Sequence, residues 1–329
     1  MLAIVNANAR RSSARSVVEL CDALPKADVV FSRTVDEARR AFERHGGLQR
    51  PLLLCGGGDG TVTSLVNLME HDRLGPPVGV LALGTGNGLA HALRSGPYLH
   101  ALRRLPNLPL PPPTLHYDLV SVEGRRSHFA GTGWDARVIA DYQRVLGVRG
   151  PIPRRLRESV LGYLYGLFRY TVPEEYRLLR EQGQARVEIT NLGPSAWTVD
   201  DTGRAVPLPG GETGRVIHEG PISVASAATS QEWGFHFRAH PHARLMPGWL
   251  NLRVYDRPVL EAVRNASRLW RGLHPQPGMH DYFVQRARMH FSRPVPFQIG
   301  GDPVGARTEL DFSVAESGVR LVDWAQRPR

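Results

Sequence analysis

Hydrophobic residues in the first third of the chain follow two alternating patterns. Short continuous apolar runs have the length of buried strands, and each precedes a stretch in which apolar residues recur every three or four positions, as on one helix face. Such repetition predicts an α/β domain with a parallel sheet, because a helix must carry the chain back between parallel strands. The expected strands are 2–6, 28–32, 51–55 and 78–83, and the expected helices are 13–23, 34–45, 61–71 and 87–104.

A proline-rich tract ends this pattern. Five of the eight residues from Pro106 to Pro113 are proline, which fixes φ and lacks a backbone N–H, so the tract cannot be helical and marks a linker. Beyond it, short runs of alternating apolar residues are separated by turn residues, which is the pattern of an antiparallel sheet. The expected strands there are 115–122, 185–190, 221–225, 250–255 and 282–291, with helices at 159–169 and 258–273.

This change of pattern predicts two domains. The chain has 329 residues, which is enough for two hydrophobic cores. We predict an α/β N-terminal domain with a parallel sheet over residues 1–113 and a C-terminal antiparallel β-sandwich domain over residues 114–304. Residues 305–329 form a C-terminal segment that we expect to pack back on the N-terminal domain.

Two glycine-rich turns carry the candidate chemistry. One predicted strand leads into Gly56-Gly57-Gly58-Asp59-Gly60-Thr61, and the next leads into Gly84-Thr85-Gly86-Asn87-Gly88. Glycines let the backbone approach a ligand closely, and the free N–H groups at the start of a helix attract anions. Neighbouring parallel strands would bring both turns to one edge of the sheet. The sequence therefore predicts a phosphate-binding site at that edge.

Other common nucleotide-binding classes do not fit these turns. The first turn lacks the spacing G-x-G-x-x-G, and no Gly-Lys-Ser/Thr is present because Lys26 is the only lysine. This excludes P-loop NTPases and protein kinases with their strand lysine. Schiff-base chemistry is excluded as well, unless Lys26 itself serves.

At these positions the chain resembles the diacylglycerol kinase catalytic-domain family, which includes bacterial lipid kinases and the sphingosine and ceramide kinases. The motifs Gly57–Thr61 and Leu83–Asn87 are similar to the two nucleotide-site motifs of that family, and Asn6 is similar to its Asn-Pro opening. Further on, Gly133-Trp134-Asp135-Ala136 and Ala243–Leu250 resemble two later motifs. The resemblance extends from Leu2 to about Val304 and implies a two-domain lipid-kinase fold with the active site in an interdomain cleft.

Three positions depart from the family pattern. Gly300-Gly301-Asp302 stands where the family has Asp-Gly-Glu, so one acidic residue is missing and the other is shortened. Met246-Pro247 replaces the metal-binding aspartate of some bacterial members. Gly88 stands where many bacterial members have Asp, and the small residue is more similar to the sphingosine and ceramide kinase branch.

The resemblance implies a role for each matching residue. Asp59 and Asp302 are expected to act in catalysis and to ligate Mg²⁺, because a carboxylate beside phosphates needs a cation or a proton between them. Asp118 and Asp135 are expected to contact the lipid substrate. The residues expected to bind ATP are Asn6, Gly57, Gly58, Gly60, Thr61, Gly84, Thr85, Gly86 and Asn87.

Structural roles are the alternatives for the same residues. Asp59 would accept local N–H groups within its turn, as aspartates in glycine-rich turns often do, and Thr61, Thr85 and Asn87 would cap helices. Asp118 would be an exposed polar residue of a strand. For Asp135 and Asp302 the alternative is a simple turn.

Charge and composition limit the classes of molecule that the protein is expected to bind. The net charge of +10 comes almost entirely from arginine and suits nucleic acid, anionic lipid or ATP. No zinc module, aromatic RNA-binding motif or helix-turn-helix accompanies it, so we expect no nucleic-acid partner. His236, His240 and His242 lack the spacing of a common zinc site. Cys21 and Cys55 are expected to be reduced thiols.

Membrane contact is predicted at one segment. Arg149, Arg154, Arg155 and Arg157 precede the mostly apolar, aromatic-rich stretch 160–168, which suits an acyl chain beside anionic head groups, with a core helix as the alternative. No apolar run approaches the roughly 20 residues that cross a bilayer. We therefore expect a cytoplasmic protein that is peripheral to the inner face of the membrane.

The function expected from these observations is that of an ATP-dependent lipid kinase. It would phosphorylate a hydroxyl of a lipid such as diacylglycerol, ceramide or a sphingoid base. A nucleotide- or lipid-binding pseudokinase is one alternative, favoured by Gly300, and an NAD kinase-like enzyme is another, disfavoured by Gly88 after Asn87. The sequence does not name the lipid, the nucleotide or the oligomeric state, for which a homodimer is one alternative.

Overall fold

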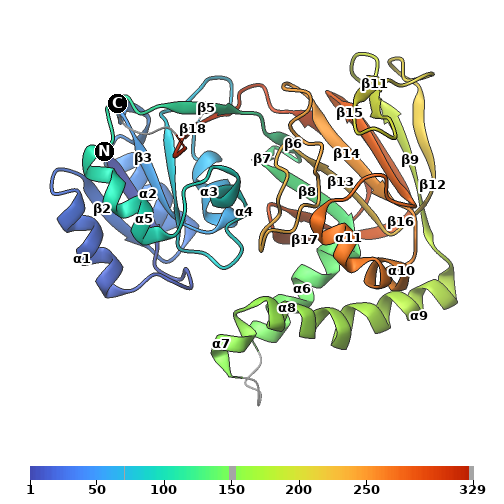
Figure 1. Ribbon diagram of the computed structural model, residues 1–329, viewed down its shortest axis with the longest axis horizontal. Helices are drawn as coiled ribbons and strands as arrows, with labels where there is room; N and C mark the ends of the chain where they lie inside the picture. The colour runs from blue at the N-terminus through green and yellow to red at the C-terminus, as the bar shows by residue number, and fades with distance from the viewer. Residues whose placement is uncertain (70, 148–152, 326–329) are drawn as a thin grey trace. The chain divides into compact units, whose positions relative to one another are not determined.

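The computed structural model of the protein describes residues 1–69, 71–147 and 153–325. The chain forms two compact units. Figure 1 colours the chain by residue number, from blue at the N-terminus to red at the C-terminus. The first unit contains Met1–Leu119, Glu232–His236 and the residues from Ala315 onward, and the second contains Val120–Gln231 and Phe237–Val314. The first unit thus extends beyond the proline-rich tract to Leu119, and the segment 305–329 divides between the units at Val314.

The first unit is built on a six-stranded sheet with the order β2-β1-β3-β4-β18-β5. The four strands from the N-terminal region pair in parallel, which confirms the α/β domain predicted from their apolar runs. The late strand β18 runs parallel to β4, and β5 pairs antiparallel with β18. These strands are β1 (Leu2–Asn6), β2 (Asp28–Ser32), β3 (Leu53–Gly57), β4 (Val78–Ala82), β5 (Thr114–Tyr117) and β18 (Val319–Val322).

Two helices of the first unit, which span 14–23 and 35–44, begin at side-chain caps that the sequence supplies. The Ser13 side chain accepts the N–H of Ser16, and the Thr34 side chain accepts the N–H of Glu37. The core consists of the apolar faces of strands and helices, joined by Trp324 from the C-terminal segment. The helices are α1 (Ala14–Ala23), α2 (Val35–Arg44), α3 (Asp59–Val66), α4 (Gly88–Ala92) and α5 (Tyr98–Arg104), with short turns η1 (Gly47–Gln49) and η2 (Leu105–Asn107).

One predicted helix of the first unit is wrong. The stretch 87–104 was expected to be a single helix, but it divides into α4 and α5. Arg94 and Gly96 adopt positive φ values of 53° and 71°, which a right-handed helix does not allow. Pro97 then precedes α5 as its cap residue. The apolar spacing continued across this break because both short helices pack on the same core.

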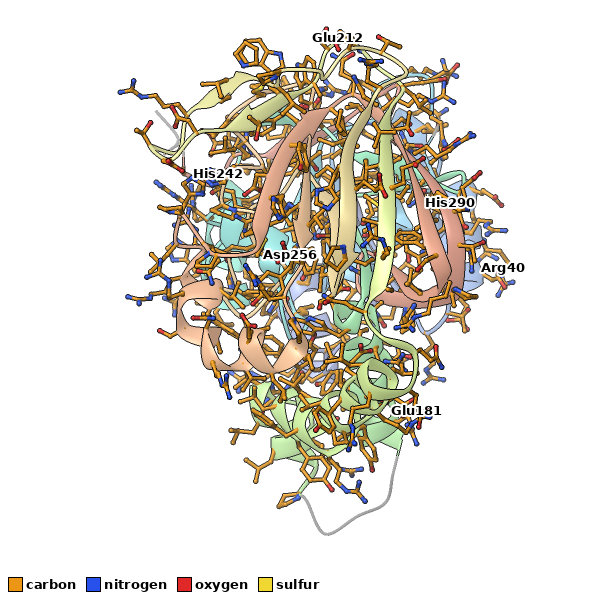
Figure 2. The ribbon with its side chains drawn as sticks, turned by 90° about the vertical axis from the view of Figure 1, so that its right-hand side faces the viewer. Arg40, Glu181, Glu212, His242, Asp256 and His290 are labelled. Carbon is orange, nitrogen blue, oxygen red and sulfur yellow. The ribbon has the colours of Figure 1, made fainter. Side chains whose placement is uncertain are left out.

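The second unit contains one connected antiparallel sheet of twelve strands, which confirms the β-rich domain. The long strand β16 pairs with β9 over its first half and with β8 near its end. Glu212 and Glu181 lie at opposite ends of these strands (Figure 2). The strands are β6 (Val120–Val122), β7 (Arg125–Ser127), β8 (Phe129–Gly133), β9 (Ala185–Asn191), β10 (Trp197–Val199), β11 (Ala205–Pro207), β12 (Val216–Ile222), β13 (Val224–Ala228), β14 (Leu250–Tyr255), β15 (Met279–Val284), β16 (Arg286–Ile299) and β17 (Asp302–Val314).

The second unit has more helix than the sequence pattern indicated. The predicted strand 115–122 divides between β5 and β6, in different sheets, and the predicted helix 258–273 is two short helices. The helices α6 and α9 were not predicted, and α9 has no buried residue that could give it an apolar period. The helices are α6 (Trp134–Gly147), α7 (Arg154–Arg157), α8 (Val160–Gly166), η3 (Leu167–Thr171), α9 (Val172–Gln182), α10 (Val259–Arg264) and α11 (Ala266–Arg271).

Candidate nucleotide site

The first glycine-rich turn joins β3 to α3. Gly57 ends the strand, and a Cβ added to it would lie 2.3 Å from the Thr61 Oγ1, so only glycine fits there. The Asn6 Nδ2 donates a hydrogen bond of 3.1 Å to the same Thr61 oxygen from the end of the neighbouring strand β1. The fold therefore brings Asn6, Gly57 and Thr61 together, and their role in binding ATP stays a prediction.

The second glycine-rich turn lies directly against the first. The backbone N–H groups of Leu83 and Gly84 donate to the Gly57 carbonyl at 3.1 and 3.0 Å. A Cβ on Gly84 would lie 2.3 Å from the Gly58 Cα, so the two turns touch backbone to backbone. Parallel pairing of β3 with β4 places both turns at the carboxyl ends of adjacent strands.

The Asp59 carboxylate connects the two turns. Its Oδ2 accepts the N–H of Gly88 at 2.9 Å, and its Oδ1 accepts the N–H of Leu89 at 2.9 Å. Asp59 thus caps the start of α4, although it belongs to the first turn of α3. Each carboxylate oxygen has a second lone pair, so capping does not use its full capacity to accept. The catalytic and Mg²⁺-binding roles of Asp59 stay predictions.

Asn87 adopts the left-handed conformation that the second turn requires. Its φ is 53°, a value that asparagine tolerates better than most residues, and its Nδ2 donates to the Gly84 carbonyl at 2.9 Å. The side chain is only 3% exposed, and its Oδ1 has no hydrogen-bond partner among the described residues. Within the described part of the chain, the Asn87 Oδ1 is therefore a buried, unsatisfied acceptor beside the second turn.

A distant segment, Glu232–His236, completes this region of the first unit. The Phe235 N–H donates to the Gly86 carbonyl at 3.2 Å. A Cβ on Gly88 would lie 2.7 Å from the Gly234 nitrogen, so a larger residue at position 88 would collide with backbone. This segment, hereafter the covering segment, was missed by sequence reasoning. The local sequence feature that could have indicated it is Gly234, a glycine between two aromatic residues. In the structure Gly234 has a φ of 125°.

Asp302 begins β17 after a two-residue hairpin turn. The turn residues Gly300 and Gly301 have φ values of 59° and 89°, a pair of positive values that glycine allows. The Asp302 carboxylate lies 3.6 Å from the Arg125 Nη2. Burial raises the pKa of Asp302, whereas the Arg125 cation acts in the opposite direction. The turn accounts for both glycines, and the catalytic and metal roles of Asp302 stay predictions.

Asp135 lies in the first turn of α6, directly after β8. It is 6% exposed, and burial raises the pKa of its carboxyl to about 7, with hydrogen bonds from Ala136 and Gln298 opposing the rise. The Gln298 Nε2 donates to its Oδ2 at 3.3 Å, while the Gln298 Oε1 accepts the N–H of Gly301. Gln298, which sequence reasoning missed, thus links Asp135 to the glycine turn before Asp302.

Asp118 belongs to the first unit and follows β5. The His116 Nε2 lies 3.4 Å from its Oδ1. This arrangement fits a polar residue next to a strand as well as a substrate contact, so its role stays a prediction. Cys55 is buried in β3, and burial together with the Asp59 carboxylate raises the pKa of its thiol to about 12. Both cysteines are free thiols, as expected.

The described fold is an α/β domain that carries two adjoining glycine-rich turns, followed by an antiparallel β domain. Residues 1–106 match the family model of the diacylglycerol kinase catalytic domain, so the resemblance found in the sequence is confirmed for this region. Diacylglycerol kinase iota of Mus musculus is 39% identical over 69 residues, which cover 20% of this chain and 7% of that protein. Diacylglycerol kinase zeta of Rattus norvegicus matches with the same identity, length and coverage.

Solved structures share the fold over nearly the whole chain. A diacylglycerol kinase from Bacillus anthracis str. Sterne has a TM-score of 0.65 at 12% identity, covering 98% of this chain and 95% of that chain. A putative diacylglycerol kinase from the same organism has a TM-score of 0.67 at 14% identity, with coverages of 98% and 94%. These likenesses confirm the two-domain fold class.

The residues of the first unit fit a phosphate-bearing ligand. Gly58 and Gly84 meet without side chains, and Thr85 and Gly86 are partly exposed at the same edge. A divalent cation here would meet the carboxylate of Asp59, which already accepts two backbone N–H groups. The donor set is therefore compatible with ATP and Mg²⁺, with Asp59 as the residue that would hold the ion.

Proposed function

We propose that the protein is an ATP-dependent lipid kinase that transfers a phosphoryl group to a hydroxyl of diacylglycerol, ceramide or a sphingoid base. The observation that carries this proposal is the contact of the two glycine-rich turns, with Asp59 bonded across them. Backbone groups that approach closely can hold phosphates, and phosphoryl transfer depends chiefly on positioning and charge neutralisation. The match of residues 1–106 to a kinase family supports the same activity.

Each predicted residue has a defined task in this proposal. Gly58, Gly84 and Gly86 would let the phosphates approach the backbone, and Asn6 would hold Thr61 in place through its amide. Asp59 would accept the proton of the lipid hydroxyl or hold Mg²⁺, which neutralises phosphate charge when bound. Asp302 would supply a second carboxylate, and Asp118 and Asp135 would contact the lipid.

Peripheral contact with a membrane is the second part of the proposal. Within the described residues, no helix combines the length and apolar character needed to span a bilayer. The side chains of Leu161 and Phe168 on α8 and η3 are 55% and 53% exposed, with Tyr165 between them. Exposed apolar and aromatic side chains on one helical face suit insertion between lipid head groups. Arg149, part of the predicted basic lead-in, lies outside the described residues.

A kinase assay across substrate classes tests the activity. Purified protein would be incubated with ATP, Mg²⁺ and mixed micelles containing diacylglycerol, ceramide or sphingosine, with NAD in a parallel reaction, and the products identified by mass spectrometry. Phosphorylated product from one lipid class supports the proposal. Product from NAD alone would support an NAD kinase-like enzyme instead. The sequence disfavours that enzyme, because Gly88 follows Asn87 in the second glycine-rich turn.

A pseudokinase is the alternative with a specific observation in its favour. The glycine at position 300, where the family has an acidic residue, forms a hairpin turn with no side chain to offer. Measurable ATP binding by calorimetric titration, without product from any lipid, would favour that alternative. We favour the active enzyme because both glycine-rich turns and Asp59 occur together, whereas a decaying site would be expected to lose them.

A further inference from the structure

We propose that His91, Glu232 and His236 form a binding site for a transition-metal ion of the Zn²⁺ class. His91 lies on α4, and the other two residues are the ends of the covering segment, so all three belong to the first unit. One donor atom from each lies within 4.8 Å of the other two. The ligands of this site differ in type from the oxygen ligands expected for the Mg²⁺ that would accompany ATP.

The distances suit ligands that share one ion. The Glu232 Oε2 lies 3.8 Å from the His91 Nδ1 and 3.6 Å from the His236 Nδ1. These distances are too long for good hydrogen bonds. They are close to the separation of roughly 3.3–3.5 Å between ligands held tetrahedrally at about 2.0–2.2 Å from zinc. A small inward movement, together with rotation of one imidazole ring, would therefore place all three atoms around one ion.

The buried donor of the group also favours an ion. The His91 Nδ1 is inaccessible to solvent and has no hydrogen-bond partner among the described residues. A buried polar atom without a partner is costly, and a metal ion would satisfy it. A carboxylate between two imidazoles supplies the negative charge that a divalent cation requires.

Binding requires one ring to turn. The imidazoles of His91 and His236 are stacked with centroids 4.0 Å apart and planes 9° apart, so their in-plane lone pairs run side by side. The His236 side chain is 70% exposed, so its ring can turn toward solvent without displacing core residues. His91, which is less exposed, would stay in place and set the position of the ion.

The ligand types select the class of metal. Two imidazole nitrogens and one carboxylate oxygen suit Zn²⁺, Co²⁺ or Ni²⁺, whereas Mg²⁺ prefers oxygen ligands and retains several waters. Three protein ligands would leave a position for water. The ion would tie α4 to the covering segment, adding to the hydrogen bond between Phe235 and Gly86.

A second cluster in the chain is a weaker candidate. His242, His274 and Asp281 also bring donor atoms within 4.8 Å in the second unit. Both oxygens of Asp281 are already bonded to the Arg253 guanidinium, at 2.9 and 2.8 Å. A buried, paired carboxylate offers little net negative charge to a cation. The His274 Nε2 is also engaged, at 2.8 Å from the Asp200 carbonyl oxygen.

The test is direct metal binding by untagged protein that has been treated with chelator and dialysed. Zn²⁺ would be titrated calorimetrically into the wild type and into Glu232→Gln and His236→Ala variants. The controls are His274→Ala from the second cluster and His290→Ala, which removes an exposed histidine of β16 (Figure 2). Co²⁺ spectra would report coordination number, and thermal melting would report stabilisation by the bound ion.

We expect one equivalent of Zn²⁺ on the wild type and on both controls, with a melting temperature that rises with Zn²⁺ concentration. Both site variants should bind at least about tenfold more weakly and lose this rise, since each lacks one of three ligands. Absence of binding by the wild type would overturn the proposal. Equal binding by the wild type and both site variants, or a loss confined to His274→Ala, would do the same. None of these outcomes depends on kinase activity.

Discussion

The Asp59 carboxylate accepts the backbone N–H of Gly88 at 2.9 Å and so bonds the first glycine-rich turn to the second. The two residues are 29 positions apart in the chain and meet because β3 and β4 are adjacent parallel strands. This bond gives Asp59 a structural task in addition to the proposed chemical one. The effect of a substitution at Asp59 must therefore be measured on both stability and activity.

Asp59→Asn should abolish most phosphoryl transfer, with a loss of at least about 100-fold, because it removes the charge that would hold a cation or accept a proton. It should also lower the free energy of unfolding by about 1 kcal/mol, since the amide has one acceptor where the carboxylate has two. Turnover and urea denaturation measure the two effects.

Thr34→Ala is the matched control for Asp59→Asn. It removes a capping hydrogen bond from α2 of the same unit, at a similar expected cost of about 1 kcal/mol, without touching either turn. The control should retain full activity. If Asp59→Asn loses no more activity than Thr34→Ala, the chemical role of Asp59 is wrong.

Gly88→Ala should destabilise the protein by roughly 1–3 kcal/mol, because the new Cβ would meet the backbone of the covering segment. Backbone cannot move aside as a flexible side chain can. Gly147→Ala provides the comparison: a Cβ there would have no atom of the described residues within 4 Å, and its effect should be neutral or slightly stabilising. Equal stability of the two variants in urea would show that the covering segment does not hold this position.

Gly300→Asp combined with Asp302→Glu restores the acidic pattern of the family. Aspartate tolerates a φ of 59° better than most residues, so we expect a cost of about 1 kcal/mol at the turn. If Asp59 already acts as the base, the double change should leave activity unchanged or reduce it. A Gly300→Asn variant with Asp302→Glu adopts the same conformation without the charge at position 300. Activity that appears only with Asp at position 300 would favour the pseudokinase alternative for the natural chain.

Asp135 should make stability fall as pH rises. Burial raises its pKa to about 7 in the folded state, while the unfolded carboxyl ionises with a pKa near 4. Between these values the unfolded state loses its proton and the folded state keeps it, so the unfolded state gains stability. The penalty grows from about pH 4 to about pH 7, is full above that, and is on the order of 2–4 kcal/mol.

Asp135→Asn removes this titration while retaining an oxygen for the Gln298 amide. We expect the variant to gain stability over the wild type at pH 8 and to gain little or nothing at pH 4, as measured by urea denaturation at both values. A difference between variant and wild type that does not change with pH would contradict the raised pKa. The contributions of the other titrating groups to the pH dependence of stability cancel in this comparison, because both proteins carry those groups.

Local sequence patterns were sufficient to predict the strands of the first domain and the two glycine-rich turns. Apolar runs such as Leu52–Cys55 must be buried, and glycines at their ends permit close backbone approach, so local pattern was sufficient. It also singled out Asn6 and Thr61, whose side chains form a hydrogen bond with each other. The helix break at Gly96 was missed because the apolar period continues across it. The helix α9 was missed because it has no buried residues that would create an apolar period.

Tertiary structure alone decided which groups meet. The covering segment reaches Gly88 from a part of the chain about 145 residues later, and no local spacing encodes that contact. The same holds for β18, which joins the first sheet after the chain has built the second, and for Gln298 beside Asp135. Burial and hydrogen bonds set the pKa of Asp135, and both depend on residues brought from elsewhere. Composition and residue spacing determine local structure, whereas the pKa values of buried groups and the long-range contacts depend on the packed fold.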